Sequence, residues 1–162
     1  MFQAGEHARV GLFALDNLWD GLGALVVDNP QIKYLYGKVT MYPEYNRESR
    51  NALLSFFHYY FPDIDALLTP IHPLEREEDY THLFEGKDFK EGHKELKSFV
   101  RERNENIPPL VNSYMGLSET MKTFGTAINP DFGGVEETGI LVTLADIYPE
   151  KKERHISTYV KR

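Results

Sequence analysis

The sequence predicts an α/β fold, and three observations near its start predict it. Apolar residues recur at helical spacing from Val10 to Val27, Asn29-Pro30 then interrupts the pattern, and a strand-like alternation follows from Ile32 to Met41. Both faces of that strand carry apolar residues, which predicts a strand covered on both sides. A loop, a helix and a buried strand in this order form half of a phosphate- or cofactor-binding unit, so the opening loop becomes a candidate site.

Length and composition limit the class of protein. A chain of 162 residues favours one domain with a real core, and 41 % hydrophobic and 13 % aromatic residues exclude a disordered chain. A net charge of −7 argues against general nucleic-acid binding, and the lack of cysteine excludes disulfides and thiolate chemistry. No apolar run approaches the length of a membrane span, and no apolar signal core opens the chain, which favours a cytoplasmic location.

The chain then continues to alternate between helices and irregular segments. A helix is expected over residues 47–61, capped near Asn46 and stopped by Pro62. Residues 66–71 are at best an edge strand, because Pro70 cannot donate to a sheet. Residues 74–92 are rich in charge, which predicts an exposed excursion with one short helix near residues 80–84.

The last third of the chain predicts two more helices and two strands. The helices are expected at residues 95–103 and from Pro109 to Met115, with Gly116 as the cap. The strands are expected at residues 121–128 and 138–147, joined by a turn at residues 130–134. A single domain over residues 1–150 would then be followed by a charged tail at 151–162, with a last strand suggested at 156–160.

Two segments resemble a family of acyltransferases. Residues 107–147 carry a Pro-Pro-Leu helix start, a Gly-Leu helix end and an Asp-Phe turn between two apolar strands, and residues 18–41 carry a Leu-Trp-x-Gly helix and a Tyr-Leu-Tyr-Gly strand. In this order and spacing they are similar to the C-terminal half of the GNAT-fold N-acyl amino acid synthases. This hemolysin-like family includes the first enzyme of ornithine-lipid synthesis and Bacteroides-type members that give glycine lipids.

The resemblance implies the C-terminal part of a GNAT-like (acyl-CoA N-acyltransferase) fold, with a mixed sheet flanked by helices. Family members carry an N-terminal half with a Glu-Leu-Gly-Arg segment that this sequence does not contain. We therefore expect an incomplete domain without the catalytic carboxylate, or a chain that dimerises to complete its sheet.

The same resemblance implies transfer of a fatty acyl group to the amine of an amino acid, expected to be glycine, in aminolipid synthesis. The donor would be the phosphopantetheine thioester of acyl carrier protein, or acyl-CoA, and no metal or nucleic acid is expected. Acyl carrier protein and the amino acid would be the partners, with peripheral membrane contact as a further expectation. Two alternatives stay open: a non-catalytic remnant or interaction module, and an N-acetyltransferase of small metabolites that uses acetyl-CoA.

The resemblance also suggests site residues, each with a simpler alternative. Tyr42 and Tyr45 could protonate the leaving thiolate, or be ordinary loop tyrosines. One carboxylate of the last hairpin could hold the amine, although turn chemistry and a solvated strand also explain such residues; the three are Asp131, Glu136 and Glu137. The cofactor would contact the opening loop and the end of the first strand, unless the loop is simply a flexible terminus; these residues are Gln3, Gly5, Arg9, Val10, Gly11, Lys38, Val39, Thr40 and Met41.

Four other features have competing interpretations. Gly21 and Gly23 interrupt the first helix, which suggests close approach to a neighbouring strand. His58 and Asp63 fit the His-x4-Asp pattern of glycerolipid O-acyltransferases, but a solvent-facing histidine at a helix end is the better interpretation. The aromatic residues at 56–61 could line an acyl tunnel, with ordinary core as the favoured alternative. A basic cluster could dock an acidic carrier; it consists of Lys33, Lys38, Arg47 and Arg50.

Overall fold

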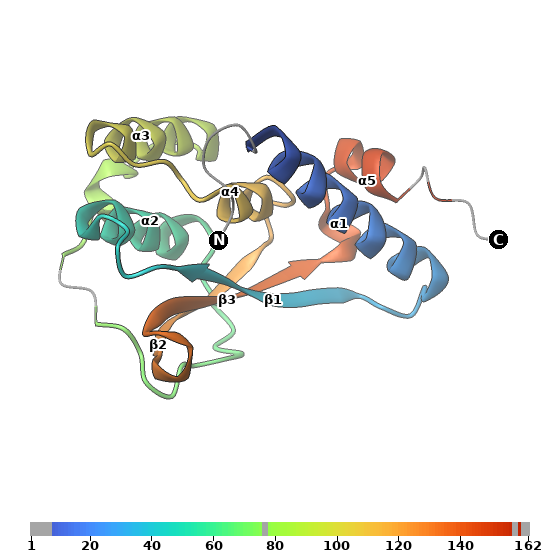
Figure 1. Ribbon diagram of the computed structural model, residues 1–162, viewed down its shortest axis with the longest axis horizontal. Coiled ribbons are helices and arrows are strands. Elements are labelled where there is room, and N and C mark those ends of the chain that lie inside the picture. Colours follow the sequence, from blue (N-terminus) through green and yellow to red (C-terminus); the bar gives the residue numbers. More distant parts are fainter. Residues whose placement is uncertain (1–7, 76–77, 157–158, 160–162) are drawn as a thin grey trace. The chain divides into compact units, whose positions relative to one another are not determined.

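A computed structural model describes residues 8–75, 78–156 and 159 of the chain (Figure 1). It has mixed α/β character, as predicted, and divides into two compact units. The first comprises residues 1–35 with 143–162, and the second comprises residues 36–142. No helix in the described part of the chain is both long enough and apolar enough to cross a membrane.

The first unit contains helices α1 (Ala8–Asp28) and α5 (Pro149–His155). Helix α1 ends where Asn29-Pro30 predicted, and the Asn29 side chain donates to the Leu25 carbonyl at 2.8 Å. Helix α5 begins with a proline, which is favourable in a first helical turn. The charged segment expected as a tail therefore starts as a helix, and most of the strand suggested at 156–160 lies outside the described residues.

Gly23 lets α1 and α5 approach each other closely. A Cβ atom at Gly23 would lie 1.7 Å from the His155 carbonyl oxygen, whereas one at Gly21 would meet no described atom within 4 Å. The His155 Nδ1 atom lies 2.8 Å from Asp20 Oδ1 beside this contact. The expected approach to a strand is therefore wrong, because the neighbour is a helix and only one of the two glycines needs the space.

The second unit is built on a three-stranded antiparallel sheet. Its strands are β1 (Tyr34–Met41), β2 (Lys122–Asn129) and β3 (Val135–Thr143), in the order β1-β3-β2. Strands β2 and β3 form a hairpin across a turn that includes η2 (Pro130–Phe132), where Gly133 and Gly134 adopt positive φ. The three strands were predicted, although β3 begins three residues earlier than expected and ends before η3 (Leu144–Asp146).

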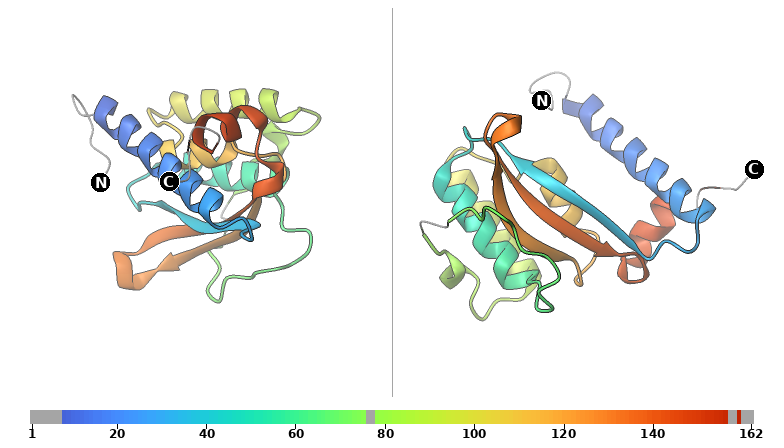
Figure 2. Two further views of the ribbon diagram at one scale, coloured as in Figure 1. Left: turned by 90° about the vertical axis from the view of Figure 1, so that its right-hand side faces the viewer. Right: turned by 90° about the horizontal axis from the view of Figure 1, so that it is seen from below.

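Helix α2 (Arg47–Tyr60) lies between the sheet and α3 (Phe89–Glu102), as Figure 2 shows. Asn46 caps α2 as predicted, because its side chain accepts from the Ser49 N–H at 3.0 Å. The ring of Phe56 packs on those of Tyr60 and Phe84, and Phe56 and Phe84 are fully buried. The aromatic segment is thus mainly core, as the favoured interpretation held.

The remaining short elements lie between α2 and β2 in the sequence. Helix α4 (Pro109–Met115) ends at Gly116 as predicted, and η1 (Thr81–Leu83) matches the short helix expected near 80–84. Helix α3 starts six residues earlier than predicted, because Asp88 and Glu91 form a capping box at its N-terminus. No strand forms at residues 66–71. The loop that contains them continues to Leu74, whose N–H donates to the Thr126 carbonyl of β2 at 2.7 Å.

Strand β1 is covered on one face only, which corrects the prediction of two covered faces. Val39 and Met41 are buried, whereas 64 % of Tyr36 is exposed and Lys38 also faces solvent. The alternation along the strand places these pairs on opposite faces of the sheet. The apolar pattern wrongly predicted a second covered face, because tyrosine combines an apolar ring with a hydroxyl that water can solvate.

We predict that Gly23→Ala lowers the free energy of unfolding by about 1–3 kcal/mol, because the new methyl group would collide with the His155 backbone. Gly21→Ala is the matched control and should raise stability by roughly 0.5–1 kcal/mol through helix propensity alone. Urea unfolding followed by circular dichroism measures both. Equal effects of the two substitutions would contradict the close approach.

Candidate functional site

The exposed face of the sheet brings two predicted site residues together. The Lys38 ammonium on β1 lies 2.7 Å from Glu137 Oε2 on β3, and the Asn129 side-chain amide donates to the same oxygen at 3.2 Å. The Glu137 side chain is 15 % exposed and that of Lys38 57 % exposed, so this cluster is partly open to solvent. A residue predicted to contact the cofactor and one predicted to contact the amine thus lie side by side.

The other predicted residues of β1 are placed differently. The side chains of Val39 and Met41 lie in the core, and Thr40 is half-buried. Any contact of Val39 or Met41 with a ligand would therefore use their backbone. Strand β1 is an outer strand of the sheet, with β3 as its one sheet neighbour among the described residues, so alternate backbone groups on its other side have no strand partner.

The two predicted catalytic tyrosines follow β1 in one short loop. The Tyr45 N–H donates to the Tyr42 carbonyl at 3.0 Å, and the Tyr45 hydroxyl donates to the Asn106 carbonyl at 3.0 Å. Burial, followed by the nearby charge of Glu105, raises the pKa of Tyr45 above its ordinary value. Tyr42 is 51 % exposed. The loop thus presents a solvent-facing phenol and a second phenol that keeps its proton at neutral pH.

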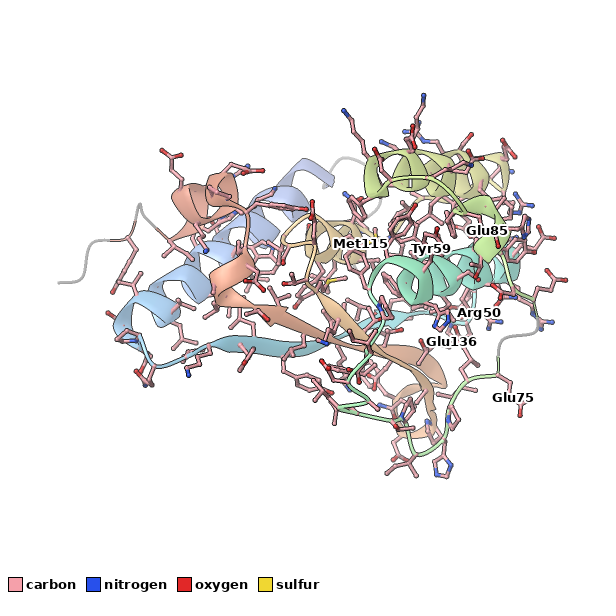
Figure 3. All side chains as sticks on the ribbon, turned by 180° about the vertical axis from the view of Figure 1, so that it is seen from behind. Arg50, Tyr59, Glu75, Glu85, Met115 and Glu136 are labelled. Carbon is pink, nitrogen blue, oxygen red and sulfur yellow. The ribbon has the colours of Figure 1, made fainter. Side chains whose placement is uncertain are left out.

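Glu136 occupies the opposite, buried face of β3. Its Oε1 atom lies 2.5 Å from an Arg50 guanidinium nitrogen, and Arg50 also donates to the Asn51 side chain at 2.9 and 3.1 Å. The Glu136 Oε2 atom is buried and has no hydrogen-bond partner within the described structure. Figure 3 shows Arg50 and Glu136 pointing toward each other between α2 and the sheet. Because both side chains are largely buried, this ion pair joins α2 to the sheet.

Several predicted residues do not join this site. Asp131 lies exposed in the turn η2 and makes no hydrogen bond or ion pair within the described structure. Gln3 and Gly5 lie outside the described residues. The other three residues of the proposed phosphate loop belong to the first turn of α1, in the other unit of the chain; they are Arg9, Val10 and Gly11.

Sequence reasoning missed the residues that hold the site residues in place. Asn129 binds Glu137, the Asn106 carbonyl accepts from Tyr45, and Glu105 Oε1 accepts from the Asn46 N–H at 3.1 Å. Two of these three lie in the loop after α3, about 60 positions from their partners. Arg50 was predicted, but as part of a basic docking cluster and not as the partner of Glu136.

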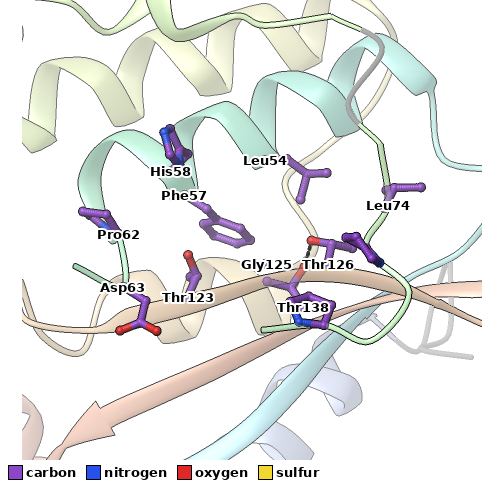
Figure 4. Close-up of a pocket in the computed structure, with 12 residues that line it drawn as sticks. Leu54, Phe57, His58, Pro62, Asp63, Leu74, Thr123, Gly125, Thr126 and Thr138 are labelled. Atoms are coloured by element: carbon purple, nitrogen blue, oxygen red, sulfur yellow. Dashed lines mark hydrogen bonds between the residues drawn. The ribbon is translucent and has the colours of Figure 1, made fainter. Parts of the chain in front are cut away.

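A cavity of about 260 Å³ lies between α2, β2 and the loop that follows α2 (Figure 4). His58 and Asp63 both line it, but no hydrogen bond joins them in the described part of the chain. The Asp63 Oδ2 atom accepts from the Leu67 N–H at 2.6 Å, which holds the loop in place. His58 is exposed at the end of α2, as the sequence suggested. Asp63 therefore anchors the loop, and His58 is a surface residue.

Two curated relatives match almost the whole chain. One, from Phocaeicola vulgatus, is 52 % identical over 99 % of this chain, and one from Bacteroides thetaiotaomicron is 51 % identical over 99 %. Both carry the name glycine N(alpha)-acyltransferase. The chain is homologous to half of a glycine N(alpha)-acyltransferase. It spans 50 % and 48 % of the length of these two acyltransferases. No family model and no solved structure matches the chain.

The described residues around β1 and β3 include two groups capable of acid–base chemistry. Glu137 offers a carboxylate on an accessible face, and Tyr45 offers a phenol that stays protonated. Within the described residues, no group of three or more His, Asp and Glu side chains could hold a metal ion.

We predict that Arg50→Met lowers the free energy of unfolding by about 3 kcal/mol, because it leaves the Glu136 carboxylate buried without its cation. The double substitution Arg50→Met with Glu136→Leu should cost less than the single one, since no unpaired charge remains. Urea unfolding of the two variants tests this. Additive losses would show that the two side chains do not interact.

We also predict that Tyr45 titrates above the ordinary tyrosine range. Its raised pKa means that the folded state favours the neutral phenol, so the stability it contributes is present below about pH 10 and is lost as the pH rises further. Tyr45→Phe should therefore flatten the fall in melting temperature above pH 10. Ultraviolet titration of the tyrosinates, with Tyr42→Phe as the control, gives a second measure. A wild-type profile identical to that of Tyr45→Phe would contradict this assignment.

Proposed function

We propose that this chain supplies part of the active site of an acyltransferase that moves a fatty acyl group from a carrier thioester to the amine of glycine. The identity of 52 % to a glycine N(alpha)-acyltransferase over almost the whole chain carries the proposal. The residues grouped around β1 and β3 agree with it chemically. A GNAT-like fold, the cytoplasm as location and peripheral contact with the membrane belong to the same proposal.

The donor in this proposal is an acyl thioester on phosphopantetheine, held by acyl carrier protein or coenzyme A. The phosphopantetheine arm carries two amides, which can pair with the free edge of a strand as an added strand does. The outer edge of β1 at residues 38–41 offers such backbone groups. Gln3 and Gly5, together with the residues of the first turn of α1, remain the proposed phosphate contact of the donor; the latter are Arg9, Val10 and Gly11.

The acceptor in this proposal is glycine, whose amine must be neutral when it attacks the thioester carbon. Glu137 is the preferred partner for the amine, because it faces solvent beside Lys38, whereas Glu136 is enclosed and bound to Arg50. Asp131 is a weaker candidate in an exposed turn. Attack forms the amide bond, breaks the carbon–sulfur bond and releases an amine proton, which Glu137 accepts. The departing thiolate takes a proton from Tyr45 or Tyr42, and solvent then returns a proton to that tyrosine.

The direct test compares the chain alone with the chain joined to the remaining half of the Phocaeicola vulgatus relative. Each is incubated with glycine and either palmitoyl-acyl carrier protein, palmitoyl-CoA or acetyl-CoA, and products are identified by mass spectrometry. N-palmitoylglycine from the joined protein supports the proposal. A folded joined protein that forms only N-acetylated products, or none while the relative is active, would refute it.

We predict that Glu137→Gln in the joined protein raises the KM for glycine about tenfold, because a neutral amide attracts the amine more weakly than a carboxylate does. Glu119→Gln is the matched control, since Glu119 is exposed and makes no hydrogen bond or ion pair in the described structure. Steady-state kinetics at varied glycine measures the change. Equal KM values for the two variants would remove Glu137 from the acceptor site.

A further inference from the structure

Helix α3 carries a row of four exposed basic side chains that the proposed site does not use. They recur at spacings of four, three and four residues, which places them within about 60° of the helix circumference. None of the four makes a hydrogen bond or ion pair with another described residue. We call this surface the α3 basic row; its members are Lys90, Lys94, Lys97 and Arg101.

No described carboxylate forms an ion pair with a member of this row. The acidic residues of the same helix make other contacts: Glu91 accepts from the Asp88 N–H at 3.2 Å, Glu95 lies 3.0 Å from the Lys87 ammonium, and Glu102 accepts from the Ser98 hydroxyl at 3.5 Å. Elsewhere in this unit Lys38 and Arg50 are paired with glutamates. In a chain of net charge −7, an unneutralised basic row is a local exception that favours an acidic partner.

A shallow cavity of about 230 Å³ lies at the C-terminal end of the row. Lys97 and Arg101 form part of its rim, and Val100, Ile107 and Pro109 contribute apolar surface. A cation-rimmed apolar hollow suits one apolar side chain presented by an acidic helix, because the charges orient the partner while the hollow buries the anchor.

We propose that the α3 basic row docks the acidic helix of an acyl carrier protein, with the cavity taking one apolar side chain of that helix. This inference rests on the carrier-bound donor of the proposed function. It replaces the basic cluster predicted from the sequence, because in that cluster Lys38 is bound to Glu137 and Arg50 to Glu136, and Arg47 also has a partner.

The architecture of α3 favours a protein partner over a lipid surface. A helix that lies on a membrane needs an exposed apolar face beside its cations. The apolar residues Leu96 and Val100 of α3 instead face the core and are fully buried. Figure 3 shows side chains that end in nitrogen projecting from α3 on the side away from α2, where a partner helix has room to approach.

The test measures binding of fluorescently labelled holo-acyl carrier protein to the 162-residue chain by anisotropy at 50 mM and 300 mM salt. Lys97→Glu should weaken binding at least fivefold. The double variant with Lys94→Glu and Lys97→Glu should weaken binding at least twentyfold, whereas Lys97→Arg should hardly change it. Lys33→Glu is the matched control, because Lys33 lies outside the row, is exposed, and has no side-chain partner among the described residues. Circular dichroism confirms that each variant is folded.

Three results would overturn the inference: no saturable binding by the wild-type chain, equal weakening by Lys33→Glu, or row-dependent binding to anionic phosphatidylglycerol vesicles but not to the carrier. In the joined protein, the row variants should raise the KM for palmitoyl-acyl carrier protein and leave that for palmitoyl-CoA unchanged. Row-dependent carrier binding without any N-acylglycine would refute the proposed reaction and leave the docking surface standing. N-acylglycine formation that the row variants do not affect would refute the docking surface and leave the proposed reaction standing.

Discussion

A buried ion pair between α2 and β3 fixes the arrangement on which the candidate site depends. Arg50 projects from the first turn of α2 and binds Glu136 at a depth where neither charge is well solvated. Because side chains alternate along a strand, the position of Glu136 under α2 places Glu137 on the opposite face. There Glu137 meets Lys38 of β1. One contact within the core thus determines which carboxylate a ligand can reach.

The same layering separates the two proposed sites on the second unit. The exposed face and outer edge of β1 carry the groups proposed for acyl transfer, whereas α3, with α2 between it and the sheet, carries the cations proposed to dock a carrier protein. Since α3 also contributes Val100 to the core, its position is set by packing and its outer row is held in register. A docking surface on a rigid helix orients a partner better than one on a loop.

Local patterns predicted most of the elements. Helical periodicity, the Asn46 cap, Pro109 and Gly116 located three helices, and alternation located the strands. The failures came from interactions that are distant in the sequence. Whether β1 is covered depends on what packs over it, and the early start of α3 depends on a capping box inside a segment judged only by its charge.

The candidate residues could be named from the sequence, but their geometry could not. The family resemblance suggested both tyrosines and Glu137 as candidates, but nothing in the sequence showed that Lys38 would bind Glu137 or that Asn106 would hold Tyr45. These contacts join residues 61 and 99 positions apart, so only the folded chain brings them together. Long-range pairing is the part of structure that local periodicity does not encode.

Hydrogen–deuterium exchange of the β1 backbone in the presence of a thioester donor shows whether the outer edge of this strand holds the donor. We expect palmitoyl-pantetheine phosphate, added to the joined protein, to slow exchange at the outward-facing amides within residues 38–41 of β1. Protection confined to the cavity beside His58 and Asp63, with β1 unchanged, would contradict it.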